Sequence, residues 1–368
     1  MRDLTTGARS LLRLLLVAVL ALAVAACGSS RTVDNGSAEV AMYTGSDRAQ
    51  KLLDGAKQEG NLLWYTTMIP DQLANPLIDA FKRKYPFANI ELYRGNSTDV
   101  AQKALQEYQA QKHTVDLVDG TGTASLLKQG NVLQPFTSPE LASYSDNLKD
   151  PDGYWGSELQ YFMVLAYNTK QVSPTDVPKT YEDLLDPRWK GKMAWSTSPT
   201  SGGPLFIGNL ISAWGQDKAT SYLQKLASQD IRNTNSSGRA VLDQVASGQV
   251  PIALEVFNDQ VEASKAKGAP VDWVALEPVT AQLSRISLTK APPHPHMAML
   301  FLDFMFSEEG QRVIQAGGGI PARPEVDAMI ASLKPAQGGF KAQYTNPDQA
   351  FDQTNKWTDL YEQLFVNK

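Results

Sequence analysis

The stretch LLWYTTMIPDQLANPLIDAFKRKYPFANIELY, residues 62–93, contains one strand–helix–strand pattern. Residues 62–66 form a short apolar and aromatic run, which predicts a buried strand. Between Asp71 and Tyr85 the apolar residues recur at four-residue spacing, which predicts a helix that ends before Pro86. Residues 90–93 predict the next strand. This stretch alone therefore predicts a strand–helix–strand unit, the repeating element of an α/β fold.

The same alternation continues towards the C-terminus. A helix is predicted over residues 98–111, a strand over 115–118 and a short helix over 123–129, which Gly130 ends. Strands and helices that alternate in this order form a parallel sheet with helices on its faces. We therefore predict an α/β fold.

A second unit follows the apolar run of residues 158–167, which is long enough to cross between two lobes. The segment 285–288 leads the chain back. Periodicity predicts strands over residues 192–195, 252–256 and 271–276, and helices over residues 203–214, 217–228, 239–246, 296–306 and 308–315.

The N-terminus has the pattern of an export signal. Basic residues precede an apolar run, Leu14 to Ala26, which is shorter than the roughly 20 residues that a membrane-spanning helix needs. The run ends in Ala25-Ala26-Cys27-Gly28, which resembles the lipobox of bacterial lipoproteins. We therefore predict a signal peptide over residues 1–26, acylation of Cys27 and a flexible tether over residues 27–57. The alternative is an incidental cysteine in an ordinary signal peptide.

Composition excludes several classes of protein. The 368 residues are enough for two domains, and the net charge of −5 with no basic stripe in the body argues against nucleic-acid binding. Cys27 is the only cysteine, so disulfides, zinc–thiolate sites and thiol catalysis within one chain are excluded.

Several ordered segments resemble the ferric-iron, thiamine and phosphonate branch of class II periplasmic binding proteins. The most specific is TYEDLLDPRWKG, residues 180–191, which is similar to a family signature. Residues 62–67, 166–169, 293–310 and 320–324 resemble other family segments, so that the likeness extends from Gly60 to Val326.

The resemblance implies a receptor of a bacterial ABC importer, with two lobes, each a mixed, mainly parallel sheet flanked by helices, joined by two hinge strands. It places lobe one at residues 58–160 and 284–368 and lobe two at residues 161–283. A small-molecule ligand would bind in the cleft, and an ABC permease in the membrane would read the closure of the lobes. We expect a monomer without a cofactor, held by its lipid on the extracellular face of the cytoplasmic membrane or in the periplasm.

Ligands of open α/β sheets bind beyond the carboxyl ends of strands, so the loops there supply the candidate residues. Small hydroxyl residues and glycines at helix starts leave backbone N–H groups free for an anion, and Arg239 follows one such loop. Each loop, taken alone, is also explained as an ordinary N-cap. The candidates are Thr66, Thr67, Gly120, Thr121, Gly122, Thr123, Ser201, Gly202, Gly203, Ser236, Ser237, Gly238, Arg239, Glu255 and Asn258.

The chain departs from the ferric pattern that the resemblance implies. Ferric members use a histidine after the first strand, a glutamate after the third and two adjacent tyrosines late in lobe two. Those positions hold Ile69, Thr121, Asn258 and Asp259 here. We therefore predict no metal site, although ferric iron stays an alternative ligand.

The predicted ligand is an organic phosphate or phosphonate, with Glu255 as the partner for the amine of a zwitterionic one. Thiamine stays an alternative, since Tyr154, Trp155 and Trp195 could stack on its ring, although hydrophobic core explains them as well. No catalytic residue is predicted, because the sequence contains no G-x-S-x-G, H-E-x-x-H or P-loop motif. A sensory receptor with the same cleft is the other alternative.

Overall fold

The computed structural model describes residues 36–345 and 347–367. The predicted signal peptide, Cys27 and the first part of the predicted tether lie outside these residues. Within the described part, one mixed sheet runs through two lobes in the strand order β2-β1-β3-β9-β4-β7-β5-β6, with β8 and β10 beside β4, and β11 beside β9. The strands are β1 (Asn61–Thr66), β2 (Asn89–Arg94), β3 (Leu117–Gly120), β4 (Gly156–Asn168), β5 (Met193–Ser196), β6 (Arg232–Thr234), β7 (Ile252–Phe257), β8 (Val271–Val274), β9 (Val279–Leu288), β10 (Ile320–Pro321) and β11 (Ala342–Tyr344).

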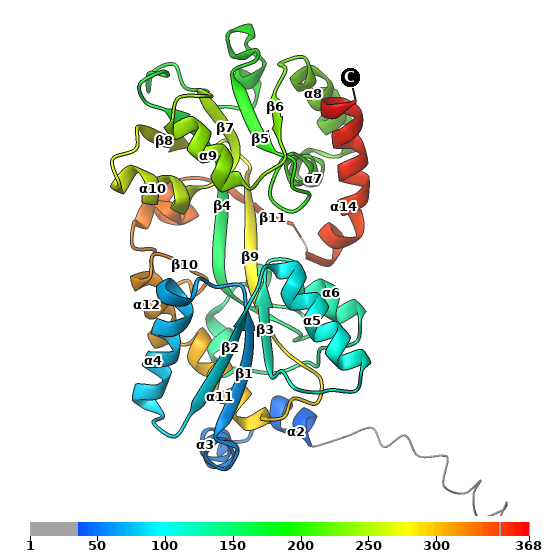
Figure 1. Ribbon diagram of the computed structural model, residues 1–368, viewed down its shortest axis with the longest axis vertical. Helices are drawn as coiled ribbons and strands as arrows, with labels where there is room; N and C mark the ends of the chain where they lie inside the picture. The colour runs from blue at the N-terminus through cyan, green and yellow to red at the C-terminus, as the bar shows by residue number, and fades with distance from the viewer. Residues whose placement is uncertain (1–35, 346, 368) are drawn as a thin grey trace, which may run out of the picture. The chain divides into compact units, whose positions relative to one another are not determined.

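Helices cover the sheet in both lobes (Figure 1). They are α2 (Ser37–Met42), α3 (Arg48–Glu59), α4 (Asn75–Lys84), α5 (Ser97–Gln109), α6 (Thr123–Gln129), α7 (Gly203–Trp214), α8 (Gln216–Ala227), α9 (Gly238–Ala246), α10 (Asn258–Ala266), α11 (Pro295–Phe306), α12 (Glu308–Ala316), α13 (Pro335–Gly338) and α14 (Pro347–Tyr361).

Lobe one is built on the parallel strands β1, β2 and β3. Its core forms where the apolar stripe of α4 meets α11, a helix whose side chains are nearly all buried. Trp64 of β1, Phe81 of α4 and Phe301 of α11 are fully buried, and the Trp64 and Phe301 ring centroids are 5.4 Å apart. The predicted strand–helix alternation is therefore confirmed in this lobe.

Lobe two has its own parallel set, β6, β5 and β7, and its own core. Trp195 of β5 lies at its centre, fully buried against Phe206 of α7 and Phe365 beyond α14. Each lobe therefore buries its own apolar surface.

The two long strands β4 and β9 join the lobes. They pair antiparallel from Gly156 to Met163, and each continues into both lobes (Figure 1). Almost every residue of either strand is buried, because other strands and helices cover both faces. The two-lobed fold with two predicted hinge strands is therefore confirmed.

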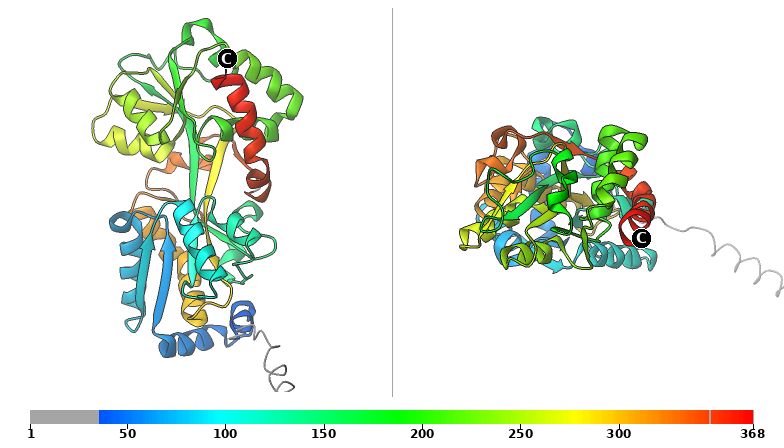
Figure 2. Two further views of the ribbon diagram at one scale, coloured as in Figure 1. Left: turned by 45° about the vertical axis from the view of Figure 1, so that its right-hand side comes forward. Right: turned by 90° about the horizontal axis from the view of Figure 1, so that it is seen from above.

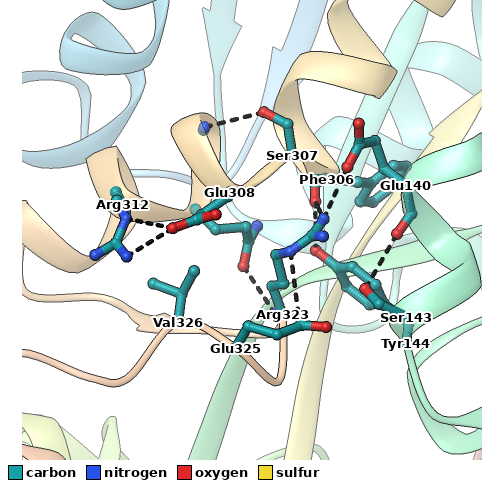
Figure 3. A network of polar contacts seen from close by, with 12 residues as sticks. Glu140, Ser143, Tyr144, Phe306, Ser307, Glu308, Arg312, Arg323, Glu325 and Val326 are labelled. Carbon is teal, nitrogen blue, oxygen red and sulfur yellow. Dashed lines mark hydrogen bonds and ion pairs between the residues drawn. The ribbon is translucent and has the colours of Figure 1, made fainter.

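A polar network braces β4 on the lobe-one side (Figure 3). The Arg323 guanidinium donates to the Glu140 carboxylate at 2.8 Å and to the Phe306 carbonyl at 3.0 Å. The backbone N–H of Arg323 donates to Gln311, whose side-chain amide donates to the carbonyl of Glu158 in β4 at 3.1 Å. The segment 320–324, one of the family-like segments, therefore has a structural role here.

The structure corrects the predicted tether. Residues 37–42 and 48–59 are helical, and both helices pack against α11 of lobe one. Arg48 is buried and forms an ion pair with Asp303 of α11. Residues 37–57 thus belong to the folded body, because their buried alanines and Leu52 have an apolar partner that the local sequence does not reveal.

The C-terminal segment also departs from its predicted lobe. Helix α14 packs along α7 of lobe two, which Figure 2 shows from two further directions. Trp357 and Tyr361 belong to the lobe-two core, and Gly208 and Gly203 of α7 leave room for their rings. The assignment of residues 284–368 to lobe one is therefore wrong for α14.

Candidate functional site

A cleft of about 350 Å³ opens on one side of the hinge strands and takes its walls from both lobes. Volumes of roughly 300–1,000 Å³ are typical of sites for small organic molecules. The cleft is lined with hydroxyl and amide groups, and its charged side chains number two, one from each lobe. Its main polar lining groups are Thr67, Arg94, Asn96, Ser97, Thr121, Tyr161, Thr200, Ser201, Asp259, Gln260 and Gln282.

Arg94 supplies the positive charge of the cleft from lobe one. It ends β2, directly before the loop that opens α5. Within the described residues its guanidinium is exposed and has neither an ion pair nor a hydrogen bond. Asn96 and Ser97, at the start of the 13-residue helix α5, line the same wall. A free arginine beside the N-terminus of a helix favours an anion.

Asp259 supplies the negative charge from lobe two. It lies in the first turn of α10, and its Oδ1 atom is buried without a hydrogen-bond partner. Burial raises the pKa of the Asp259 carboxyl to about 6. Tyr161 and Phe257 form the adjacent wall, with ring centroids 5.1 Å apart. A carboxylate in this environment favours a cationic group that restores the solvation it has lost.

Two buried acids lie beneath the cleft. Asp119, at the end of β3, accepts hydrogen bonds from the backbone N–H and the hydroxyl of Thr67, both at 2.9 Å, and so fixes the loop after β1. Glu158 of β4 is fully buried, and both of its carboxylate oxygens lack a partner. Burial, together with the charge of Asp119, holds the pKa of Glu158 well above its usual range. These acids shape the hinge but do not line the cleft.

Three predicted site residues do line the cleft: Thr67, Thr121 and Ser201. Their loops follow β1, β3 and β5, at the edge of the sheet where the strand-end rule places a ligand. Gly122 lines a second cavity behind the hinge instead, and Thr121 lines both cavities.

Other predicted residues in the same loops have structural roles. Thr66 is buried and accepts a hydrogen bond from the N–H of Met68, while buried Thr123 donates to the carbonyl of Ser97. Gly120 has a φ of 142°, and a Cβ there would collide with Thr123. Gly202 and Gly203 pack too tightly for a side chain, against the Ser196 carbonyl and Tyr361 respectively. These positions hold the loops in place.

The structure corrects the prediction that the loop Ser236-Ser237-Gly238-Arg239 binds the ligand. None of these residues lines either cavity among the described residues. Ser237 is an ordinary N-cap that accepts from the Ala240 N–H, and exposed Arg239 pairs with Asp243 one turn along α9 at 2.9 Å. A local hydroxyl–glycine pattern predicts a helix start, but the direction in which that start faces depends on packing.

The structure also corrects the predicted ligand-binding roles of Glu255 and Asn258. Residues 254 and 255 together oppose Leu165 in a β-bulge, where Glu255 has a φ of 55°. Its carboxyl is buried in lobe two, and this burial raises its pKa to about 8. Asn258 is fully buried and donates to the Leu333 carbonyl at 3.0 Å. The carboxylate that lines the cleft is therefore that of Asp259, not that of Glu255.

The cleft is poor in metal ligands. Of the positions that hold iron ligands in ferric members, Ile69, Thr121 and Asp259 line it, and of these only Asp259 carries a carboxylate. In the described ranges, three or more histidine, cysteine, aspartate or glutamate side chains nowhere gather closely enough to hold a metal ion. His294 and His296 bind separate acids, Asp116 and Glu59, at 3.0 and 2.6 Å.

The aromatic residues considered for thiamine are not in the cleft either. Trp195 lies in the core of lobe two, and Trp155 is buried beside Arg285. Tyr154 packs against the ammonium of Lys128. These rings have structural partners, so the stacking hypothesis finds no support in this arrangement.

Several residues that line or support the cleft escaped sequence reasoning, Arg94 and Asp119 among them. Arg94 is the last residue of β2, the strand beside β1, so applying the strand-end rule to every strand would have found it. Asp119 stands at the C-terminal end of buried β3, where a carboxylate in an otherwise apolar strand signals a special role. Asp259 is adjacent to predicted Asn258, and α10 begins one residue before it.

Comparison with known proteins agrees with this fold. Residues 76–340 match the family model described as bacterial extracellular solute-binding protein. Iron uptake protein A2 of Synechocystis is 23% identical over 265 residues, which cover 67% of this chain and 76% of that protein. A putative 2-aminoethylphosphonate-binding periplasmic protein of Salmonella typhi is 23% identical over 204 residues, 53% of this chain and 59% of that protein.

The fold has solved counterparts. A Trichodesmium structure (IdiA, FutA) in complex with iron and citrate superposes with a TM-score of 0.71 at 22% identity, covering 83% of this chain and 99% of that one. No helix in the described part of the chain is long and apolar enough to cross a membrane. With a two-lobed fold, a polar cleft on its hinge and a family match over most of its length, this chain belongs to the bacterial extracellular solute-binding proteins of the ABC-importer type.

Proposed function

We propose that this chain is a lipid-anchored receptor that captures a zwitterionic organic phosphonate or phosphate and delivers it to an ABC permease. One observation carries the choice of ligand. The two charged side chains of the cleft have opposite signs and come from opposite lobes, Arg94 from lobe one and Asp259 from lobe two. A ligand with an anionic and a cationic end would satisfy both charges when the lobes close.

The anionic end has a natural place beside lobe one. There Arg94, the first turn of α5 and the hydroxyls of Ser97, Thr67 and Thr121 line one wall. Phosphonate oxygens accept several hydrogen bonds at once, and arginine forks match them well. The volume of about 350 Å³ also favours an organic molecule over a bare ion.

The cationic end would lie against lobe two. Asp259 has an unpaired oxygen there, and the tyrosine and phenylalanine rings of residues 161 and 257 can contact an ammonium group through their faces. Ferric iron is the competing cargo, since several relatives carry names that refer to iron. Hard Fe(III) prefers a set of oxygen ligands, and the cleft offers it Tyr161 and Asp259 without a second tyrosine.

The test compares three probes by isothermal titration calorimetry on the full chain in detergent: 2-aminoethylphosphonate, ethylphosphonate and ferric citrate. We expect Arg94→Gln to weaken both phosphonates by about tenfold to a hundredfold, as loss of one partner of a charge pair does. We expect Asp259→Asn to weaken only 2-aminoethylphosphonate, so that its preference over ethylphosphonate disappears.

Arg239→Gln is the matched control, because this exposed arginine is outside the cleft and should bind like the wild type. Binding of ferric citrate alone would overturn the proposed ligand. An unchanged preference in Asp259→Asn would remove Asp259 from the site.

A further inference from the structure

A second cavity, of about 110 Å³, lies behind the hinge strands; we call it the rear chamber. Residues 281–285 of β9 form one wall, and α14 covers it with Ala350, Phe351, Thr354 and Trp357. Thr121, Thr200 and Gln282 separate it from the cleft, because they line both cavities. The proposed function makes no use of this chamber.

Arg285 is the charged side chain of the rear chamber. It is only 4% exposed, its Nη1 donates to the Ser125 hydroxyl at 3.2 Å, and its Nη2 donates to the Thr121 carbonyl. Its guanidinium also lies over the Trp155 ring, 5.3 Å from the centroid. The Nε atom is buried and has no hydrogen-bond partner.

Buried arginine is normally paired directly with a carboxylate, and here the nearby acids are not in direct contact with it. Arg285 forms no ion pair within the described part of the chain. Asp150 and Asp348 lie 3.2 and 3.3 Å from the Lys128 ammonium, and burial keeps the pKa of Glu158 raised, which favours its neutral form. The charges of Asp348 and Asp150 still favour the charged form of Arg285, but no described group accepts a hydrogen bond from its Nε atom, which is left for a ligand.

A second unsatisfied group lines the same chamber. The hydroxyl of Thr345 is buried and has no hydrogen-bond partner. The remaining walls are largely apolar, with Leu205, Leu283 and Trp357 among them.

From this geometry we infer that the rear chamber is a second binding site, specific for a short-chain monocarboxylate whose carboxylate pairs with Arg285 and whose alkyl part fills the apolar end. A phosphate dianion fits less well, because it needs more donors than one Nε and one hydroxyl provide. Since Thr121, Thr200 and Gln282 border both cavities, an occupant of the chamber contacts groups that also shape the cleft.

Calorimetric titration of the full chain in detergent with butyrate and with its neutral isostere butyramide tests this inference. We expect butyrate to bind and butyramide not to bind, because only the former neutralises Arg285. Arg285→Gln should weaken butyrate by at least about tenfold, the range for a hydrogen bond to a charged group. Ala350→Leu should abolish binding by filling the chamber while it leaves the arginine in place.

Arg94→Gln is the matched control, since it removes the cleft cation and should leave butyrate binding unchanged. Loss of butyrate binding in that variant would overturn the inference, because the carboxylate would then lie in the cleft. Absence of butyrate binding in the wild type, or wild-type binding by both Arg285→Gln and Ala350→Leu, would also overturn it. Phosphonate binding is measured separately, so failure of the proposed ligand is distinguishable from failure of this site.

Discussion

The two sides of the hinge strands differ in how their charges are held. On the cleft side, Arg94 and Asp259 face the cavity from different lobes, and no ion pair joins them. On the rear side, α14 of lobe two reaches lobe one, where the Lys128 ammonium is 3.3 Å from Asp348 and the Gln129 amide donates to Asp352 at 3.3 Å. On the cleft side no ion pair joins the two facing charges, whereas on the rear side polar contacts between α14 and α6 join the two lobes.

This difference indicates where movement is easy. Rotation of the lobes about β4 and β9 can close the cleft without breaking an ion pair between Arg94 and Asp259, whereas rotation on the rear side strains the contacts of α14. Closure would bring the two cleft charges towards a ligand placed between them. We therefore expect the rear contacts to act as a pivot, and a ligand that pairs with both cleft charges to favour the closed arrangement.

The largest expected effect comes from removing the anchor of the rear side. Trp357→Ala deletes a ring that is 5% exposed and packs onto Gly208, so the free energy of unfolding should fall by about 3–5 kcal/mol. Urea denaturation measures the change. Phe351→Ala on the same helix is the control, since that ring is 38% exposed and should cost far less. Equal losses in the two variants would mean that α14 is not anchored through its tryptophan.

An intermediate effect is expected on the cleft side, from pH. Asp259 has a raised pKa of about 6, so in the unliganded protein its contribution to stability is present below its ordinary value of 3.8 and is lost as pH rises through about 6. Binding of an ammonium group needs the ionised carboxylate of Asp259. The affinity for such a group therefore rises with pH, whereas the contribution to stability falls. The ratio of 2-aminoethylphosphonate to ethylphosphonate affinity should therefore fall by roughly tenfold per pH unit below 6.

Calorimetry between pH 4.5 and 8 checks this dependence. The ammonium group of 2-aminoethylphosphonate lowers its second phosphonate pKa relative to that of ethylphosphonate, so each affinity is first corrected for the ionisation of the free probe. In Asp259→Asn the ratio should be flat across the range. A persistent dependence in that variant would assign the amine to another acid.

The smallest effect should come from removing the ion pair between Lys128 and Asp348 on the rear side. Asp348→Asn removes a partner of Lys128 whose side chain is 46% exposed, and partly exposed pairs contribute about 0–1 kcal/mol. The loss in unfolding free energy should shrink further in high salt, since screening already weakens the pair. Asp359→Asn, an exposed aspartate on the same helix, should have no measurable effect. A loss above about 2 kcal/mol for Asp348→Asn would show that the tie is far stronger than a surface pair.

The sequence predicts those parts of the fold that depend on local pattern. The helices over residues 203–214 and 123–129 have the predicted bounds, because each has a clear apolar stripe and a glycine at its end. Helices α2 and α3 were missed because their sequence is rich in alanine and charged residues, and only contact with α11 gives their apolar side a partner.

The candidate site divides in the same way. Thr67, Thr121 and Ser201 were predictable, since a loop after a parallel strand lies at the ligand edge wherever the sheet forms. Arg239 and Glu255 were predicted wrongly. Each lies where the local sequence is typical of a binding site, but packing turns its side chain away from the cleft. A bulge in β7 buries Glu255, and the next helix start brings Asp259 to the cleft in its place.

The sequence by itself determined the alternation of strands and helices, the two crossings between lobes and the family likeness, because all of these depend on neighbours along the chain. Tertiary structure alone decided the opposed charges of the cleft, the buried Arg285 and the place of α14. The physical reason is that charge compensation and burial depend on which distant groups come within a few ångströms, and no local period in the sequence encodes those distances.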